Sequence, residues 1–194
     1  MGKIKSALEI ALERTESVKG DKDRIGQYEA KQKGKKLANQ FLEGNVKSLT
    51  EEIEKEAADG RASFKQGLFD VLISQMVLPA AREEIKRIET SCQGLLTVIG
   101  GKHFTEIARQ VGQMMNQYLN EAAQYEEAIK RQYAPKLRQK EEELSRRLGR
   151  HVKLDPFQDP EFVTYYNQNI NNLKANYEAI AEEIQKQAES MFTL

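Results

Sequence analysis

The chain has 194 residues, of which 39% are hydrophobic and 31% are charged, and its formal net charge is zero. This neutral balance gives no indication of binding to nucleic acid or membrane by bulk charge, and the length allows a core that needs no disulfide or metal. The high charge and low apolar content indicate long helices with narrow apolar stripes, because much of each such helix faces water.

Cys92 is the single cysteine, so the chain forms no intramolecular disulfide, which fits a reducing compartment. It lies on an apolar stripe, which predicts a small buried core residue and not a nucleophile. No stretch approaches the roughly 18 apolar residues of a membrane-spanning helix, and polar residues interrupt the segment from Ile4 to Leu12. We therefore expect a cytoplasmic protein.

Two helices are predicted within residues 1–44. The first carries Ile4, Leu8 and Leu12 on one stripe and is expected to end at Gly20. Asp21 or Asp23 would cap the second, whose middle is basic and poor in apolar residues. We expect a single all-helical domain over residues 1–194, in which residues 1–44 form an N-terminal helical extension.

The centre of the core is predicted between Phe64 and Leu78, where apolar residues cover most of the helix circumference. Leu49 and Ile53 precede it on one helical face. Pro79 is expected either to kink this helix or to begin the next one at its first turn. The following stripe continues to Ile99 and stops at two consecutive glycines, residues 100 and 101.

A very long helix is predicted from His103 to Leu148, with a kink at Pro135. Its apolar residues recur in steps of three and four, which is typical of coiled-coil-like packing. The stripe consists of Phe104, Ile107, Val111, Met114, Tyr118, Ala122, Tyr125 and Ile129.

The last helix is expected to begin after Asp159 as N-cap, with Pro160 at its first position. Two interleaved heptad positions follow, one apolar throughout and the other with a single polar residue, which suggests a coiled coil. They are Val163, Ile170, Tyr177, Ile184 and Met191, and then Tyr166, Leu173, Ile180 and Gln187.

Charge predicts that the last two helices pair as a hairpin, placed within residues 103–194. Residues 130–153 hold nine Lys/Arg against three Glu, whereas residues 161–194 hold five Glu against two Lys. A turn between them would set opposite charges side by side.

No catalytic, cofactor-binding or metal-binding signature is recognised. His103 and Glu106 lie one turn apart, but two ligands rarely make a metal site, which needs three or four. The many glutamate pairs resemble solvated helix surfaces and lack the cleft that acid–base catalysis requires.

Two basic clusters are the candidate partner-binding residues, because either could contact the phosphates of nucleic acid or of lipid headgroups. The alternative is that they are solvated faces paired with neighbouring glutamates. The first cluster consists of Lys31, Lys33, Lys35 and Lys36, and the second of Arg146, Arg147, Arg150 and Lys153.

The sequence thus predicts an all-α fold, an elongated bundle of long antiparallel helices or helical hairpins with coiled-coil-like packing. We expect a non-enzymatic interaction or scaffold protein that binds a protein partner or itself as a homo-oligomer. Two alternatives stay open: binding to nucleic acid or an anionic membrane surface through the Lys/Arg clusters, and a helical-bundle enzyme or small-molecule carrier with a pocket near residues 64–78.

Overall fold

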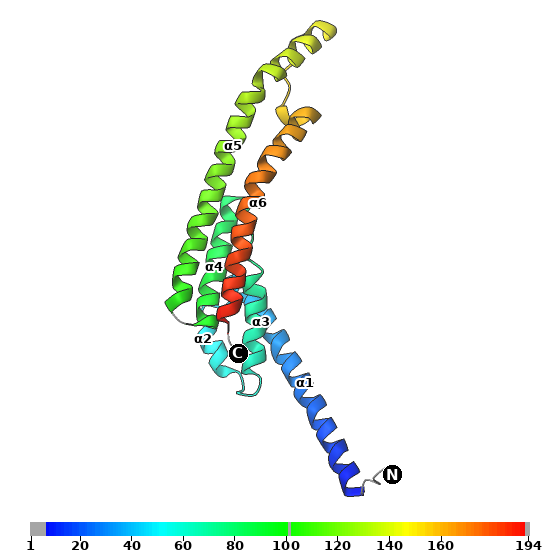
Figure 1. Ribbon diagram of the computed structural model, residues 1–194, viewed down its shortest axis with the longest axis vertical. Coiled ribbons are helices and arrows are strands. Elements are labelled where there is room, and N and C mark those ends of the chain that lie inside the picture. The colour runs from blue at the N-terminus through cyan, green and yellow to red at the C-terminus, as the bar shows by residue number, and fades with distance from the viewer. Residues whose placement is uncertain (1–6, 101, 193–194) are drawn as a thin grey trace. The chain divides into compact units, whose positions relative to one another are not determined.

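The computed structural model describes residues 7–100 and 102–192, and of residues 7–22, 102 and 103 it describes the backbone alone. Six α-helices and one 3-10 turn make up these residues, and no strand occurs among them (Figure 1). The all-α class predicted from the sequence is therefore confirmed. The elements are α1 (Ala7–Leu42), α2 (Leu49–Lys55), α3 (Arg61–Ile73), α4 (Arg82–Ile99), α5 (Lys102–Leu148), the 3-10 turn Pro156–Gln158 and α6 (Pro160–Met191).

The chain divides into two compact units. Unit 1 contains residues 1–76, 87–108 and 188–194, and unit 2 contains residues 77–86 and 109–187. The boundary therefore falls within α4, α5 and α6. The predicted boundaries at residues 1–44 and 103–194 stay predictions.

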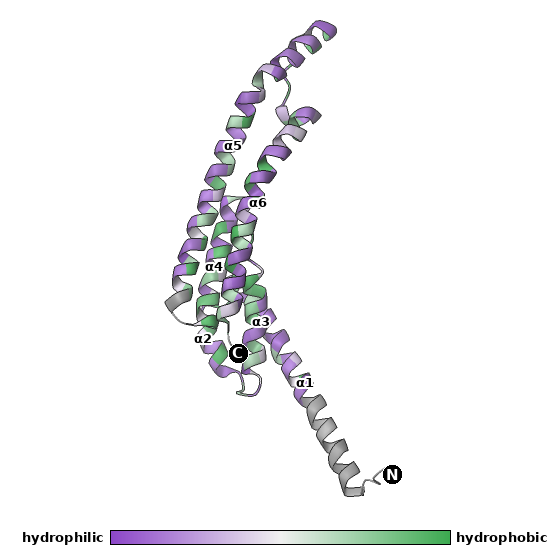
Figure 2. Cartoon of the chain, viewed as in Figure 1, coloured by the Kyte–Doolittle hydropathy of each residue, from purple (hydrophilic) through white to green (hydrophobic). Residues whose placement is uncertain are grey.

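Unit 1 has its core between α3, α4 and the first turns of α5. Leu68, Leu72, Leu95 and Phe104 are fully buried there, and green residues gather on α3 and α4 in Figure 2. The buried Ser91 hydroxyl donates a hydrogen bond to the carbonyl oxygen of Leu72, which joins α4 to α3. Leu68 and Leu72 lie within the stretch from Phe64 to Leu78 that the sequence predicted as central, whereas Leu95 and Phe104 come from the following helices.

In unit 2, α6 runs antiparallel to α5. Ring centroids lie 5.3 Å apart between Tyr118 and Tyr177, and 5.2 Å apart between Tyr133 and Phe162. Residue numbers thus rise along α5 as they fall along α6, and the predicted pairing of the two helices is present over these residues. The elongated form and the coiled-coil-like packing stay predictions.

The predicted helix break at Gly20 is wrong, because α1 continues through it as one helix of 36 residues. A glycine ends a helix when it takes a positive φ angle, whereas inside a helix it costs only about 1 kcal/mol. Among the described residues, the glycines with positive φ are Gly44, Gly100 and Gly149, each just beyond a helix end. The stripe predicted for Ile4, Leu8 and Leu12 lies on residues whose side chains are not described.

The prediction for Pro79 is also wrong, since this residue neither kinks a helix nor occupies a first turn. Helix α3 already ends at Ile73, where the Ser74 hydroxyl bonds to the carbonyl oxygen of Val71 at 2.8 Å. Pro79 is buried in the connection before α4. Glu84 then accepts a hydrogen bond from the backbone N–H of Ala80 at 2.8 Å, a side-chain cap for this end of α4.

Two details of the predicted apolar stripes are corrected. Tyr125 and Ile180 are each 48% exposed, and Gln187 is also exposed. In α6 the buried positions are Phe162, Tyr177, Ala181, Ile184 and Ala188, so the second heptad position faces away only at Ile180 and Gln187. A helix with 3.6 residues per turn drifts from a strict seven-residue repeat, and the buried face moves around it. Helix α5 continues through Pro135 and curves in Figure 1.

Candidate functional site

The first basic cluster lies on the part of α1 that crosses α3. Lys31 Nζ is 2.9 Å and Lys35 Nζ 3.8 Å from the Asp70 carboxylate of α3, and Lys33 Nζ is 3.8 Å from Glu56. Burial acts to raise the pKa of Asp70, but hydrogen bonds from Lys31 and Gln66 outweigh it and hold that pKa below its usual value. Three of the four predicted phosphate-binding lysines therefore face carboxylates of their own unit.

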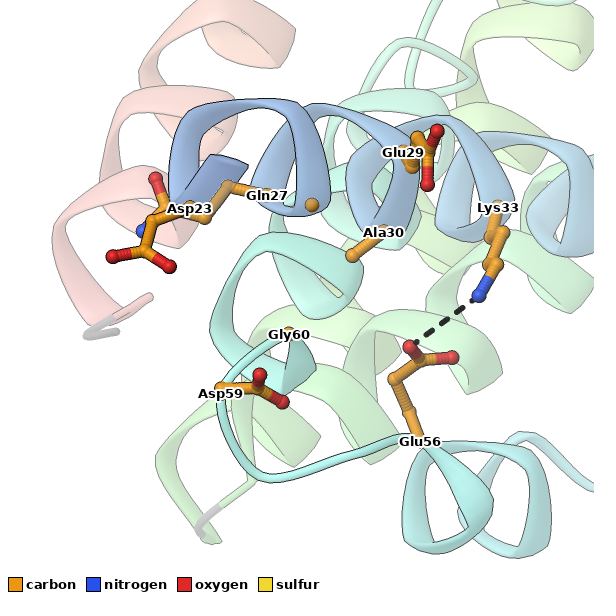
Figure 3. Close-up of a pocket in the computed structure, with 9 residues that line it drawn as sticks. Asp23, Gln27, Glu29, Ala30, Lys33, Glu56, Asp59 and Gly60 are labelled. Carbon is orange, nitrogen blue, oxygen red and sulfur yellow. Dashed lines mark ion pairs between the residues drawn. The ribbon is translucent and has the colours of Figure 1, made fainter. Parts of the chain in front are cut away.

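A hollow of about 450 Å³ opens beside this cluster, between α1 and the connection from α2 to α3 (Figure 3). Lys33 and Glu56 face each other across it, and Ala30 lies so close to Gly60 that a Cβ atom on Gly60 would be 3.3 Å from the Ala30 Cβ. Four carboxylates and one lysine give the lining an acidic balance. The lining residues are Asp23, Gly26, Gln27, Glu29, Ala30, Lys33, Glu56, Asp59 and Gly60.

This hollow is not a metal centre by its donor set. Over the described part of the chain, no three His, Cys, Asp or Glu side chains come close enough to hold a metal ion.

Lys36, the fourth lysine of the cluster, lines a neighbouring hollow of about 310 Å³ together with Glu52, Lys55 and Glu56. The side chain of His103, the weak metal candidate of the sequence, lies outside the described residues.

An ionic network around the buried Asp159 joins α5 to the start of α6 in unit 2. Lys140 Nζ lies 2.7 Å from Asp159 and also bonds to Glu161, and the Tyr133 hydroxyl donates to Asp159 at 3.0 Å. Lys136 Nζ pairs with Glu161 at 3.0 Å. The Asp159 side chain is only 5% exposed, whereas Lys140 is 32% and Glu161 57% exposed, so the network reaches from the hairpin seam to the surface.

The charges of this network stabilise one another. Hydrogen bonds to Asp159 and Glu161 raise the pKa of Lys140. Burial acts to raise the pKa of Asp159, but the bonds from Lys140 and Tyr133 lower it overall. Burial, and then the Asp159 carboxylate, raise the pKa of Tyr133. None of these groups is shifted toward neutral pH, where a general acid or base works best.

The sequence indicated only part of this network. It named Asp159 as the N-cap of the last helix, and it predicted the attraction between basic α5 and acidic α6. It did not single out Tyr133 or Lys140, because their separation of seven residues places both on the seam only after the hairpin forms. Because Tyr133 and Lys140 lie 26 and 19 residues from Asp159 in the sequence, no local sequence pattern indicates that they contact it.

The second basic cluster lies at the hairpin tip, which we define as residues 144–154. Arg146, Arg147, Arg150 and Lys153 are all exposed. Arg146 lies 3.6 Å from Glu142 on the same helix face. For the other three cations, the described residues place no carboxylate within ion-pair distance. This cluster therefore differs from the first, whose lysines are largely paired.

Cys92 is 5% exposed on α4, as the sequence predicted. Burial, and then the charge of Glu89, raise the pKa of its thiol to about 11. A thiol with so high a pKa is almost wholly protonated at neutral pH, so it is a poor nucleophile.

None of the described helices is long and apolar enough to cross a membrane. A model of a family of unknown function, DUF6657, matches residues 50–190. The match spans α2 to α6 to within one residue at each end and leaves out α1. No curated protein and no solved structure matches the chain.

Proposed function

The chain belongs to the DUF6657 family of unknown function, and from this premise we propose that it is a non-enzymatic interaction protein. Its α5–α6 hairpin binds a helix of a second copy of the same chain. The observation that carries this proposal is a stretch of half-exposed apolar side chains in the middle of the hairpin.

This middle stretch lies between two well-buried ends. Ile129 and Phe162 are buried towards the tip, and Tyr177 and Ile184 are buried towards the other end. Between them the seam residues are only partly covered, because two helices alone cannot enclose the side chains between them. The half-exposed residues are Tyr118, Ala122, Tyr166, Ile170 and Leu173.

A third helix laid along this stretch would remove more apolar surface from water, at about 25 cal/mol for each Å² buried. Val163, Ile170, Tyr177 and Ile184 repeat every seven residues, a spacing typical of helices that assemble with helices. A second copy brings the same repeat on its own α6. We therefore propose that the functional form of the protein is a homo-oligomer.

Light scattering on the full chain tests this directly. We expect a mass of at least twice the 22.2 kDa of one chain. The double substitution Ile170→Ser/Leu173→Ser should shift the mass toward one chain, because it removes apolar surface from the middle stretch. A single-chain mass for the unsubstituted protein at high concentration would contradict the proposal.

The matched control is Asn172→Ser/Asn176→Ser, two exposed positions on the same helix. It should leave the mass unchanged. Circular dichroism of both variants must show helix content equal to that of the unsubstituted chain, so that a loss of mass reports lost association and not unfolding. An equal loss in both variants would count against the middle stretch as the interface.

A further inference from the structure

We propose that the hairpin tip, residues 144–154, binds the surface of an anionic lipid bilayer. The tip carries four Lys/Arg and no Asp or Glu. Basic clusters near a membrane are attracted by the negative potential of anionic headgroups. This contact is separate from the proposed self-association, which uses the middle stretch of the hairpin.

Three of the four tip cations are unpaired within the described part of the chain, whereas several cations elsewhere face carboxylates of their own unit. Lys31 faces Asp70 within unit 1, and Lys136 and Lys140 face Glu161 within unit 2. Arg147, Arg150 and Lys153 have no such carboxylate among the described residues. Their charge is directed to solvent, and Figure 2 colours the last turns of α5 mainly purple.

Hydrogen bonds and a glycine turn give the tip a defined backbone conformation. Gly149 takes a φ of +64° and ends α5. The backbone N–H of Val152 then bonds to Ser145 Oγ at 2.9 Å, and that of Leu154 bonds to Glu141 Oε1 at 2.8 Å. These two bonds fold the chain back along the end of α5. They hold Arg150 and Lys153 on the same end of the hairpin as Arg146 and Arg147.

The tip also extends past the start of α6. Lys140 lies opposite Asp159, and the eight residues from there to the end of α5 add about 12 Å of helix. A flat surface can therefore reach the cations from the end of the hairpin.

Leu148 distinguishes a bilayer from a nucleic acid as the partner. Its side chain is 56% exposed among the four cations, where it could enter the boundary between headgroups and acyl chains. No Phe, Tyr or Trp, the large rings on which bases stack best, lies within 144–154, and His151 is the one ring there. The nearest aromatic ring, Phe157, already packs edge-on against Phe162 and Tyr166, each at 5.2 Å.

Co-sedimentation with phosphatidylcholine vesicles, with and without phosphatidylserine, tests the proposal on the full chain. We expect binding only to the vesicles that contain phosphatidylserine. The triple substitution Arg147→Gln/Arg150→Gln/Lys153→Gln should weaken it about a hundredfold, at about fivefold for each cation removed. Leu148→Ser should weaken it several-fold with no change in charge.

The matched control is Arg138→Gln/Lys174→Gln/Lys186→Gln, which removes three exposed cations elsewhere in unit 2. It should leave vesicle binding within about twofold of the unsubstituted protein, although its charge change is the same. Equal weakening by both triple variants would overturn the assignment to the tip. Failure of the unsubstituted protein to bind, or binding to duplex DNA without binding to vesicles, would overturn the proposal itself. Light scattering of the tip variant should show an unchanged mass, which separates this result from self-association.

Discussion

At the scale of single residues, two glycines set the crossing of α1 and α3. A Cβ atom on Gly34 would lie 2.1 Å from the carbonyl oxygen of Phe64, and one on Gly67 would lie 2.1 Å from that of Lys31. Both would meet backbone atoms, which cannot move aside as the end of a flexible side chain can. The crossing thus brings the backbones into contact, and it places Lys31 beside Asp70.

Gly34→Ala is therefore expected to destabilise the protein by about 1–3 kcal/mol, because the added methyl group forces the two helices apart. Gly26→Ala is the matched control on the same helix, since a Cβ there meets no atom within 4 Å. That control should be neutral or stabilising by up to about 1 kcal/mol, because alanine is the better helix former. Urea unfolding followed by circular dichroism measures both, and equal stability of the two variants would contradict the close crossing.

At the scale of elements, the start of α6 depends on Asp159. Its Oδ1 accepts the backbone N–H of Glu161 at 3.1 Å, as an N-cap does, while the same carboxylate bonds to Lys140. One side chain thus ends the loop, begins the helix and fastens it to α5. The edge-on contact of Tyr133 with Phe162 completes the junction.

The stability contributed by the Asp159 charge should depend on pH. The pKa of Asp159 is lower in the folded protein than in the unfolded chain. This contribution is therefore complete when the pH is above the unfolded-state pKa of about 3.9, and it is lost as the pH falls through the folded-state pKa. The difference in thermal midpoint between the unsubstituted protein and Asp159→Asn should therefore shrink from neutral pH to about pH 3. Asp159→Ala should cost about 1 kcal/mol more than Asp159→Asn, which keeps a capping side chain. A difference that is constant with pH would show that the charge contributes nothing.

At the scale of the whole molecule, the division into two units predicts separable cores. Tyr28 is the only one of the seven tyrosines in unit 1, and the other six lie in unit 2. Since the chain has no tryptophan, tyrosine fluorescence reports mainly on unit 2, whereas circular dichroism reports on the helices of both. Two probes can thus follow two cores without a label.

Leu68→Ala, at a fully buried position of unit 1, should cost about 2–5 kcal/mol. We expect it to lower the urea midpoint seen by circular dichroism more than the midpoint seen by tyrosine fluorescence. Ile129→Ala in the core of unit 2 should do the reverse, since Ile129 packs with Tyr133 and Phe162. Identical shifts of both probes in both variants would mean that the units unfold as one.

Apolar spacing, helix-end residues and charge were together enough to predict the fold class, the long helix ending at Leu148, the turn before Asp159 and the pairing of the last two helices. These features rest on local rules: helix periodicity, glycine and proline at helix ends, and opposite charges on neighbouring segments. Burial of Cys92 followed from the same stripe. The exposed tip cluster was also visible as a run of Lys/Arg without carboxylates.

Only the tertiary structure decided which faces and which charges are used. Gly34 and Gly67 lie on different helices, so their shared contact has no signature in either sequence segment. The same holds for Lys31 with Asp70 and for Lys140 with Asp159, where the partner is far away in the chain. The periodicity of apolar residues predicts a stripe on a helix. Which residues of that stripe are buried depends on the position of the neighbouring helix and on the drift of a helix with 3.6 residues per turn, as the exposure of Ile180 shows.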